Sequence, residues 1–271
     1  PIPFEKMEEA NKFRSYAEKY NLTPILITYY YQKWLSLNKK WNALKREYPT
    51  TPEEAFEAIA EGTFYGEQIG WMEQNGQIGI YPYDKALKVH TVWDLGVGKN
   101  LRIGFFQRNT GNDRVLMIDH WVGQGSDGIP EAAIAIQRKP YIYGRHFGPH
   151  DVEATDIGTG KTREETARLH GIKFTLVPDF SIEDGINGVS YWLQRLLVNK
   201  DTCKEWIKSM KNYSHEWDEK RGMYKDEPFH NWASHDADLG RYASLVEKQM
   251  TNDVYRVPAY FQDKMIDVWR G

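Results

Sequence analysis

Cysteine and long apolar runs are nearly absent from this sequence, and each absence excludes a class of protein. The single cysteine, Cys203, cannot form a disulfide within the chain or build a zinc site that needs several thiolates. Such sparing use of cysteine fits a reducing compartment. No apolar run approaches the roughly 18 to 20 residues that cross a bilayer, and we find no secretory leader. We therefore expect no membrane partner.

An excess of basic residues is missing as well. The net charge is −3 and the isoelectric point is about 6.3, whereas proteins that simply coat nucleic acid are usually basic. This balance leaves room for a local basic surface beside an acidic pocket. The 271 residues include 10 Trp, 17 Tyr and 11 Phe, enough for one large domain or one domain with a smaller companion. Because the chain starts without methionine, we expect it to be part of something longer.

The N-terminal region has the pattern of helices. Residues 8–20 are charged and mildly amphipathic, and Thr23 is a helix cap followed by proline, which begins a helix predicted to run to about Ala43. Large apolar residues recur in this helix every three or four positions and are assigned to the core: Tyr29, Tyr30, Trp34, Leu37 and Trp41. Residues 62–84, with glycines and short apolar runs, are predicted to be a linker wrapped on the next domain.

Alternating apolar and polar residues then predict strands in quick succession. Three of them form an antiparallel meander with short turns: 87–93, 101–108 and 115–122. Helices and strands alternate after the meander: a helix at 128–139, a strand at 141–147, a helix at 161–170, a strand at 173–177 and a helix at 181–199. A hairpin near 219–224 and a helix at 234–248 follow. The predicted fold class is α/β.

The stretch from Arg46 to Phe56 reads REYPTTPEEAF, with a capping box formed by Thr51 and Glu54 at a helix start. The string EYPTTPEEAF closely resembles the segment that joins the ATPase and nuclease halves of the large terminase subunit of tailed bacteriophages. That subunit is the motor that cuts and packages viral DNA. The resemblance implies that residues 1–61 are a helical linker or remnant leading to an absent ATPase domain. Residues 62–271 would be a nuclease domain of ribonuclease H-like fold, with a mixed central sheet of about five strands flanked by helices.

Three aspartates fall where that fold would bring them together. Asp94 ends the first predicted strand, and glycines follow it, so that backbone and ligand can approach closely. Asp151 comes after the strand at 141–147. Asp238 lies on the last helix, three residues after His235 and on the same helical face, whereas Asp236 points elsewhere. Each aspartate taken alone is also explained as a turn or cap residue.

The terminase resemblance supports the same three positions. Asp94 in VWDLG is similar to the first acidic residue of the family's nuclease, and Asp151 in GPHD is similar to the second. SHDADLGRY resembles the family's signature of an acidic residue followed one turn later by Arg-Tyr, which places the third on Asp238. GPHD departs from the family's usual wording, so Asp156 is the nearest rival of Asp151.

The resemblance implies a metal-dependent endonuclease that cleaves double-stranded, concatemeric viral DNA during genome packaging. Two Mg²⁺ or Mn²⁺ ions, which prefer hard oxygen ligands, would be held by Asp94, Asp151 and Asp238. His235 would support these ligands or donate a proton. Implied partners are double-stranded DNA, the portal protein and the small terminase subunit. The implied location is the host cell cytoplasm, where a virus-encoded motor acts transiently on the procapsid.

Two alternatives to this function stay open. One is another ribonuclease H-like nuclease of the resolvase or integrase type, for which EYPTTPEEAF would have no explanation. The other is a non-catalytic docking module of the packaging motor, which predicts neither metal binding nor cleavage.

One tempting motif is rejected. Residues 156–162 read DIGTGKT, but Thr155 stands where a phosphate-binding P-loop requires glycine. We therefore expect no ATPase activity from this chain. The loop is interpreted instead as a contact to DNA phosphates through Lys161 and Arg163.

Overall fold

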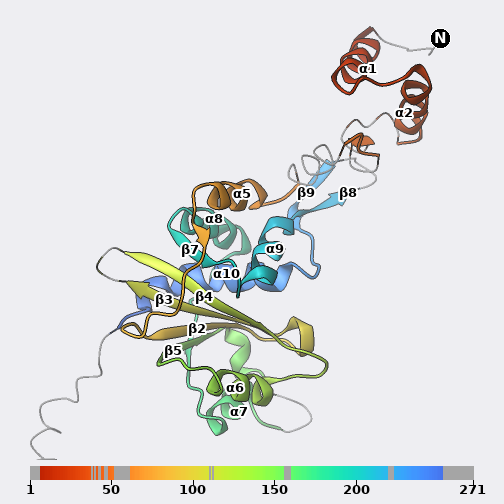
Figure 1. Ribbon diagram of the computed structural model, residues 1–271. Helices are drawn as coiled ribbons and strands as arrows, with labels where there is room; N and C mark the ends of the chain where they lie inside the picture. Colours follow the sequence, from red (N-terminus) through yellow and green to blue (C-terminus); the bar gives the residue numbers. More distant parts are fainter. Residues whose placement is uncertain are drawn as a thin grey trace, which may run out of the picture. The chain divides into compact units, whose positions relative to one another are not determined.

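The computed structural model describes residues 7–37, 39, 41, 44–45, 48–51, 62–109, 111, 113–155, 160–218 and 223–252 (Figure 1). The chain forms two compact units, one of Pro1–Glu67 with Lys211–Asn231 and the other of Gln68–Met210 with Trp232–Gly271. Each unit has a buried apolar cluster of its own. The functional boundary expected after residue 61 stays a prediction. No helix in the described part of the chain is long and apolar enough to cross a membrane.

Aromatic packing builds the first unit. α1 (Met7–Lys19) and α2 (Pro24–Ser36) pack against each other through buried side chains. These are Phe13, Tyr16, Tyr30, Tyr31, Trp34 and Leu44. Thr23 caps α2, because its hydroxyl accepts a hydrogen bond from the Leu26 amide. The predicted core role of Tyr30 and Trp34 is confirmed, but Tyr29, which the spacing assigns to the same core, is 44% exposed. The helix itself ends at Ser36, earlier than expected, where the Leu37 amide bonds back to the Lys33 carbonyl.

The predicted hairpin forms as the antiparallel pair β8 (His215–Asp218) and β9 (Met223–Pro228), and it groups with this unit rather than with the residues after 62 as expected. Trp217 packs edge-on against Tyr224 across it, with ring centroids 4.8 Å apart. The capping box expected at Thr51 and Glu54 lies outside the described residues.

A mixed sheet of seven strands, in the order β1-β7-β4-β3-β2-β5-β6, forms the centre of the second unit. β2 (Val89–Asp94), β3 (Arg102–Asn109) and β4 (Arg114–Val122) are the predicted antiparallel meander. β5 (Tyr143–Gly148) and β6 (Phe174–Leu176) continue the sheet in parallel on the other side of β2. Because β2 and β5 are parallel, the residues that follow them lie at the same edge of the sheet.

Two short strands that the sequence pattern does not predict extend the sheet beyond β4. β1 (Ile78–Gly79) pairs in parallel with β7 (Leu196–Asn199), which pairs in parallel with β4. The sheet therefore has seven strands rather than about five. The expected linker at 62–84 contains β1 and also a helix, α5 (Gly66–Gln74).

The helix expected over 181–199 ends early, as α8 (Ile182–Leu193). At its end, the Gln77 side-chain amide donates hydrogen bonds to the carbonyls of Leu193, Gln194 and Leu196. These bonds satisfy carbonyl groups that a helix end leaves without partners, and the chain turns directly into β7.

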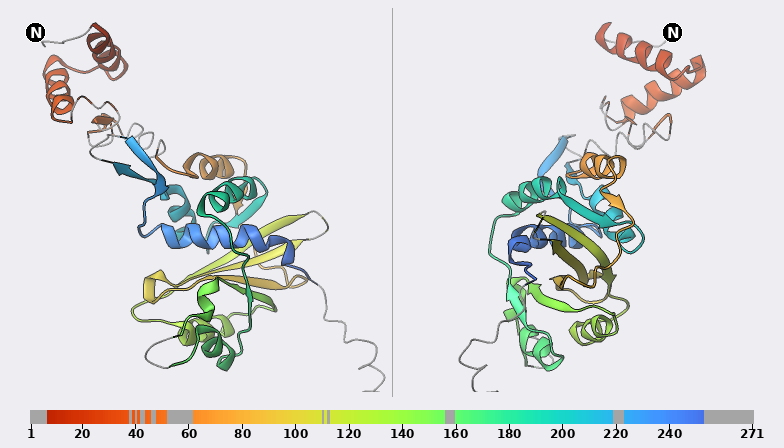
Figure 2. Two further views of the ribbon diagram at one scale, coloured as in Figure 1. Left: turned by 180° about the vertical axis from the view of Figure 1, so that it is seen from behind. Right: turned by 60° about the vertical axis from the view of Figure 1, so that its left-hand side comes forward.

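Helices cover both faces of the sheet (Figures 1 and 2). α6 (Ile129–Gln137) and α7 (Arg163–Leu169) pack together on one face, and α8 and α10 (Ser234–Val246) pack together on the other. α10 runs across β2, β3 and β5. The remaining elements are α9 (Lys204–Asn212) and three 3₁₀ turns, η1 (Gly98–Asn100), η2 (His150–Glu153) and η3 (Glu247–Gln249). α10 therefore lies against β2, which ends in Asp94, and against β5, which Asp151 follows.

Candidate active site

Asp94 and His235, which are far apart in the sequence, are in direct contact. Asp94 is the last residue of the fully buried β2, and His235 is the second residue of α10. The Nδ1 atom of His235 lies 2.9 Å from Oδ2 of Asp94, to which it donates a hydrogen bond. The packing of α10 on β2 brings His235 to Asp94, whereas the sequence predicts only that His235 shares a helical face with Asp238 and supports the metal ligands.

Burial and the neighbouring charges shift the pKa of both partners. Burial raises the pKa of Asp94 to about 6; the His235 hydrogen bond opposes this rise and the charge of Asp238 adds to it. The hydrogen bond to Asp94 raises the pKa of His235 above its ordinary value. The two groups therefore titrate as a coupled pair. A carboxylate in this environment would be stabilised by a nearby cation.

Asp238 lies one turn further along α10 and accepts a hydrogen bond from the Arg241 guanidinium. Tyr242 follows, four residues after Asp238 and on the same side of the helix. Burial, and then the charges of Asp94, Asp238 and Asp151, raise the pKa of Tyr242. All three predicted aspartates thus lie within electrostatic reach of one phenol.

Asp151 lies in η2, directly after β5, and is largely exposed. Its Oδ2 atom is 3.5 Å from Nη1 of Arg163, the first residue of α7. Lys161, the other predicted DNA contact, is exposed two residues earlier. Asp156, the rival second ligand, lies outside the described residues, so the choice of Asp151 stays a prediction.

The carboxylate oxygens of the three aspartates suit a hard divalent cation, but the three side chains are not gathered closely together among the described residues. Carboxylate oxygens are the ligands that Mg²⁺ and Mn²⁺ prefer. Among the described residues, however, no three His, Cys, Asp or Glu side chains are grouped so that they could hold a metal ion. Arg163 pairs with Asp151, and Arg241 pairs with Asp238. These arginines would compete with a bound ion for the two carboxylates, each of which keeps a second oxygen that can ligate a metal.

Asp236 points away from Asp94, as expected, but into a buried charged cluster that the sequence analysis missed. Its Oδ1 atom lies 2.8 Å from Nε2 of His120 and 3.3 Å from Nε of Arg102. Its Oδ2 atom accepts a hydrogen bond of 2.5 Å from the Ser209 hydroxyl. Burial alone would raise the pKa of Asp236, but the contacts with His120, Arg102 and Ser209 outweigh it and lower the pKa. The cluster fixes the first turn of α10 against β3 and β4.

A signal for Arg102 was present in the sequence. Arg102 is the cross-strand partner of Asp94 in the register of β2 and β3. A count outward from the turn between the predicted strands 87–93 and 101–108 places Arg102 opposite Val92, two residues from its actual partner, so the sequence brings Arg102 near Asp94 without giving the pair. The burial of Arg102 beside Asp236 depends on the docking of α10, for which sequence spacing offers no guide.

The Gly-Lys-Thr run at 160–162 begins a helix. The Thr162 hydroxyl accepts a hydrogen bond from the Glu165 amide, and the Glu165 carboxylate accepts one from the Thr162 amide, at 3.1 and 2.7 Å. This is a capping box at the start of α7. The box accounts for the Thr and for the helix that follows it, and it places Arg163 beside Asp151.

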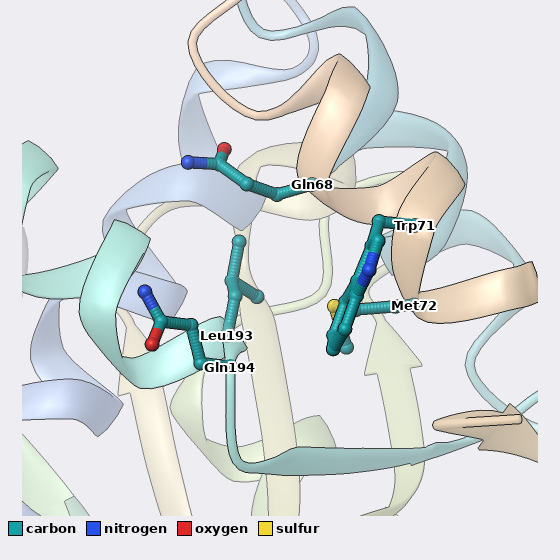
Figure 3. A pocket seen from close by; sticks show the side chains of 5 residues that line it. All are labelled: Gln68, Trp71, Met72, Leu193 and Gln194. Atoms are coloured by element: carbon teal, nitrogen blue, oxygen red, sulfur yellow. The ribbon is translucent and has the colours of Figure 1, made fainter. Parts of the chain in front are cut away.

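A separate cavity of about 400 Å³ lies between α5 and the end of α8. Gln68, Trp71 and Met72 from α5 face Leu193 and Gln194 across it (Figure 3). These lining residues include no acidic side chain, and none of them belongs to the site around Asp94. The cavity adds nothing to the chemistry of that site.

Comparison with solved structures identifies the fold. No family model matches the sequence, and no curated protein matches it significantly. Over 70% of this chain, the structure is similar to the large terminase of a thermophilic bacteriophage, with a TM-score of 0.50 and 19% sequence identity. The chain has the fold of a phage large terminase. It spans 46% of that thermophilic-phage protein. The predicted ribonuclease H-like fold and the terminase resemblance are therefore confirmed at the level of the fold.

Isolated terminase nuclease domains are similar to this chain as well. The nuclease domain of the P22 large terminase matches 65% of this chain and 90% of its own length, at 16% identity and a TM-score of 0.48. The g2p nuclease domain of bacteriophage SPP1, solved with bound Mn, matches 60% of this chain and 86% of its own length. Its identity is 15% and its TM-score is 0.43.

Proposed function

We propose that this chain is a metal-dependent endonuclease that cleaves double-stranded, concatemeric viral DNA during genome packaging. The observation that carries the proposal is the 2.9 Å contact between Asp94 and His235 on a terminase-like fold, with Asp238 one turn further along the same helix and Asp151 just after β5, the parallel neighbour of β2. Turn and cap roles explain each aspartate singly, but they give no reason for three separate elements to bring carboxylates to one place.

The site residues take distinct roles in this proposal. Asp94, Asp238 and Asp151 hold Mg²⁺ or Mn²⁺ through carboxylate oxygens. When bound, two such ions activate the attacking water and stabilise the leaving 3′ oxygen of the cleaved phosphodiester. His235 orients Asp94 through its hydrogen bond and holds a proton beside the reacting groups. Arg163 and Lys161 contact DNA phosphates, with Arg163 exchanging its Asp151 contact for a phosphate.

The net charge of the whole chain predicts a low affinity for DNA. At a net charge of −3, few lysines and arginines are left to neutralise phosphates and release counterions. Cleavage should therefore need high protein concentration and should weaken as salt rises. Within this proposal, the portal protein and the small terminase subunit are the partners that add affinity for DNA, and the chain acts in the host cytoplasm. The chain itself has no ATPase activity.

A docking module without catalysis is the second candidate function. The pairing of Arg163 with Asp151 and of Arg241 with Asp238 favours it, because these carboxylates already have cationic partners. In this alternative the arginines are permanent neutralising partners and the chain only joins parts of the motor.

Cleavage of supercoiled plasmid separates the two candidates. We expect the 271-residue chain to nick or linearise plasmid with little sequence preference, and only with Mg²⁺ or Mn²⁺ present. Asp238→Asn should abolish cutting, because it replaces an anionic oxygen ligand with a neutral amide of the same shape. Asp201→Asn, at an exposed position outside the site, is the matched control and should cut normally. Absence of cutting by the unmodified chain, or full activity of Asp238→Asn, favours the docking module.

A further inference from the structure

The hydroxyl of Tyr242 is a polar group of the site to which the described residues offer no hydrogen bond. Tyr242 lies on α10, four residues after Asp238, and is half-buried. Its ring packs edge-on against Phe180, with the centroids 6.5 Å apart and the planes at 84°. This contact holds the apolar part of the ring.

The other polar side chains around Tyr242 are already engaged. His235 bonds to Asp94, Arg241 to Asp238 and Arg163 to Asp151. A phenol can both donate and accept, and the charged groups that act on Tyr242 include three carboxylates, which when ionised only accept. The described part of the site therefore contains an uncommitted donor beside its acidic groups.

Such a donor favours phosphodiester cleavage. Negative charge on the non-bridging phosphate oxygens must be stabilised in the transition state, and fixed hydrogen-bond donors supply that stabilisation. A lysine or arginine at this position would pair with the carboxylates, as Arg241 and Arg163 do. A neutral hydroxyl remains available to the substrate.

We infer that the Tyr242 hydroxyl donates a hydrogen bond to a non-bridging oxygen of the scissile phosphate, which makes Tyr242 a catalytic residue. This inference rests on the proposed nuclease function. It assigns to Tyr242 the role of a preorganised donor, positioned by the same helix that carries Asp238 and His235. It also explains why the phenol ring of Tyr242 packs on Phe180 while its hydroxyl has no hydrogen bond from the described residues.

Tyr242→Phe tests the inference, because it removes only the oxygen. Loss of one such donor typically lowers a rate by about 10²-fold or more, so we expect plasmid cleavage at saturating DNA to fall by about 10²-fold. Mn²⁺ affinity by calorimetry, duplex affinity in Ca²⁺ and the melting temperature should each stay close to those of the unmodified chain. Tyr191→Phe, which changes an exposed tyrosine on α8, is the control and should retain full activity.

The outcomes distinguish this inference from the proposed function. If the unmodified chain does not cut, the nuclease function itself fails. If the unmodified chain cuts and Tyr242→Phe cuts at the same rate, the nuclease stands and the inference is overturned. A rate loss accompanied by an equal loss of Mn²⁺ affinity or by a lower melting temperature also overturns it, since the role of Tyr242 is then structural.

Discussion

Asp236 and Asp238 are two residues apart on α10, yet their side chains have opposite surroundings. Asp238 is partly exposed and pairs with Arg241. Asp236 is 1% exposed and is surrounded by His120, Arg102 and Ser209. An exposed carboxylate with one cationic partner can exchange it for another cation. A buried carboxylate with three partners is a structural charge, and its removal leaves a guanidinium buried without compensation.

The substitution Asp236→Asn should therefore destabilise the fold. Breaking a buried ion pair by removing one partner costs about 3 to 5 kcal/mol, because Arg102 stays buried. Urea unfolding followed by circular dichroism measures the loss. Asp201→Asn serves as the control and should change the free energy of unfolding by less than about 0.5 kcal/mol. If Asp236→Asn lowered the free energy of unfolding by less than about 1 kcal/mol, the contacts of Asp236 with its buried partners would not stabilise the fold as proposed.

At the residue scale, the sequence predicts the positions of Asp94, Asp238 and His235 on their strand and helix better than it predicts their partners. Strand ends and helical spacing place Asp94, Asp238 and His235, because these depend on local periodicity. The pairing of Arg241 with Asp238 and the burial of Arg102 depend on how α10 docks on the sheet. Docking is decided by the whole core, so these contacts appear only in three dimensions.

At the scale of elements, two histidines tie β2 to its neighbours. The His90 ring accepts a hydrogen bond of 3.0 Å from the Arg145 amide and bonds to the Thr251 carbonyl through its other nitrogen. The Nδ1 atom of His146 lies 2.7 Å from the Thr91 hydroxyl. Burial lowers the pKa of His90 and of His146 to about 4. Both rings are therefore neutral in the folded protein at neutral pH.

This neutrality predicts the acid sensitivity of the fold. Histidines of the unfolded chain titrate near pH ~6.5, so the unfolded state binds more protons than the folded state between that pH and about 4. The stabilisation is complete above the unfolded pKa and is lost as pH falls through that window. Each histidine contributes up to roughly 3 kcal/mol over it, at about 1.36 kcal/mol for each pH unit. Urea unfolding at about pH 7 and about pH 4.5 measures the loss.

His146→Gln isolates one of the two contributions, since glutamine does not titrate. The variant should be less stable than the unmodified chain near neutral pH, and it should lose less stability when the pH is lowered to about 4.5. An unchanged pH dependence would mean that His146 is not protonated on unfolding in this range.

Among the elements, the alternating strands and the helices between them are predictable from the sequence. β2, β3 and β4 alternate clearly, and the element order through β6 follows from it. The early end of α8 is not predictable in this way, because Leu196 and Leu197 continue the helical spacing of Leu193. Pairing with β4 and the Gln77 hydrogen bonds override that local pattern. Tertiary contacts decide such short segments.

On the scale of the whole molecule, similarity to solved structures identifies the fold, whereas the chemistry is inferred from the site. The likeness to the large terminase of a thermophilic phage covers 70% of this chain at 19% identity, which establishes the arrangement of strands and helices. The same arrangement can carry different activities, so function rests on the site. We propose that Asp94, Asp151 and Asp238 together bind a divalent ion, although two of them have arginine partners in the structure.

Anomalous diffraction from crystals grown with Mn²⁺ tests this claim most directly. We expect an Mn²⁺ peak bounded by carboxylate oxygens of Asp94, Asp151 and Asp238. Crystals of Asp238→Asn, prepared in the same way, should show a weaker peak or none. A peak at another place would contradict this proposal. So would arginine pairs that persist with no peak between these aspartates.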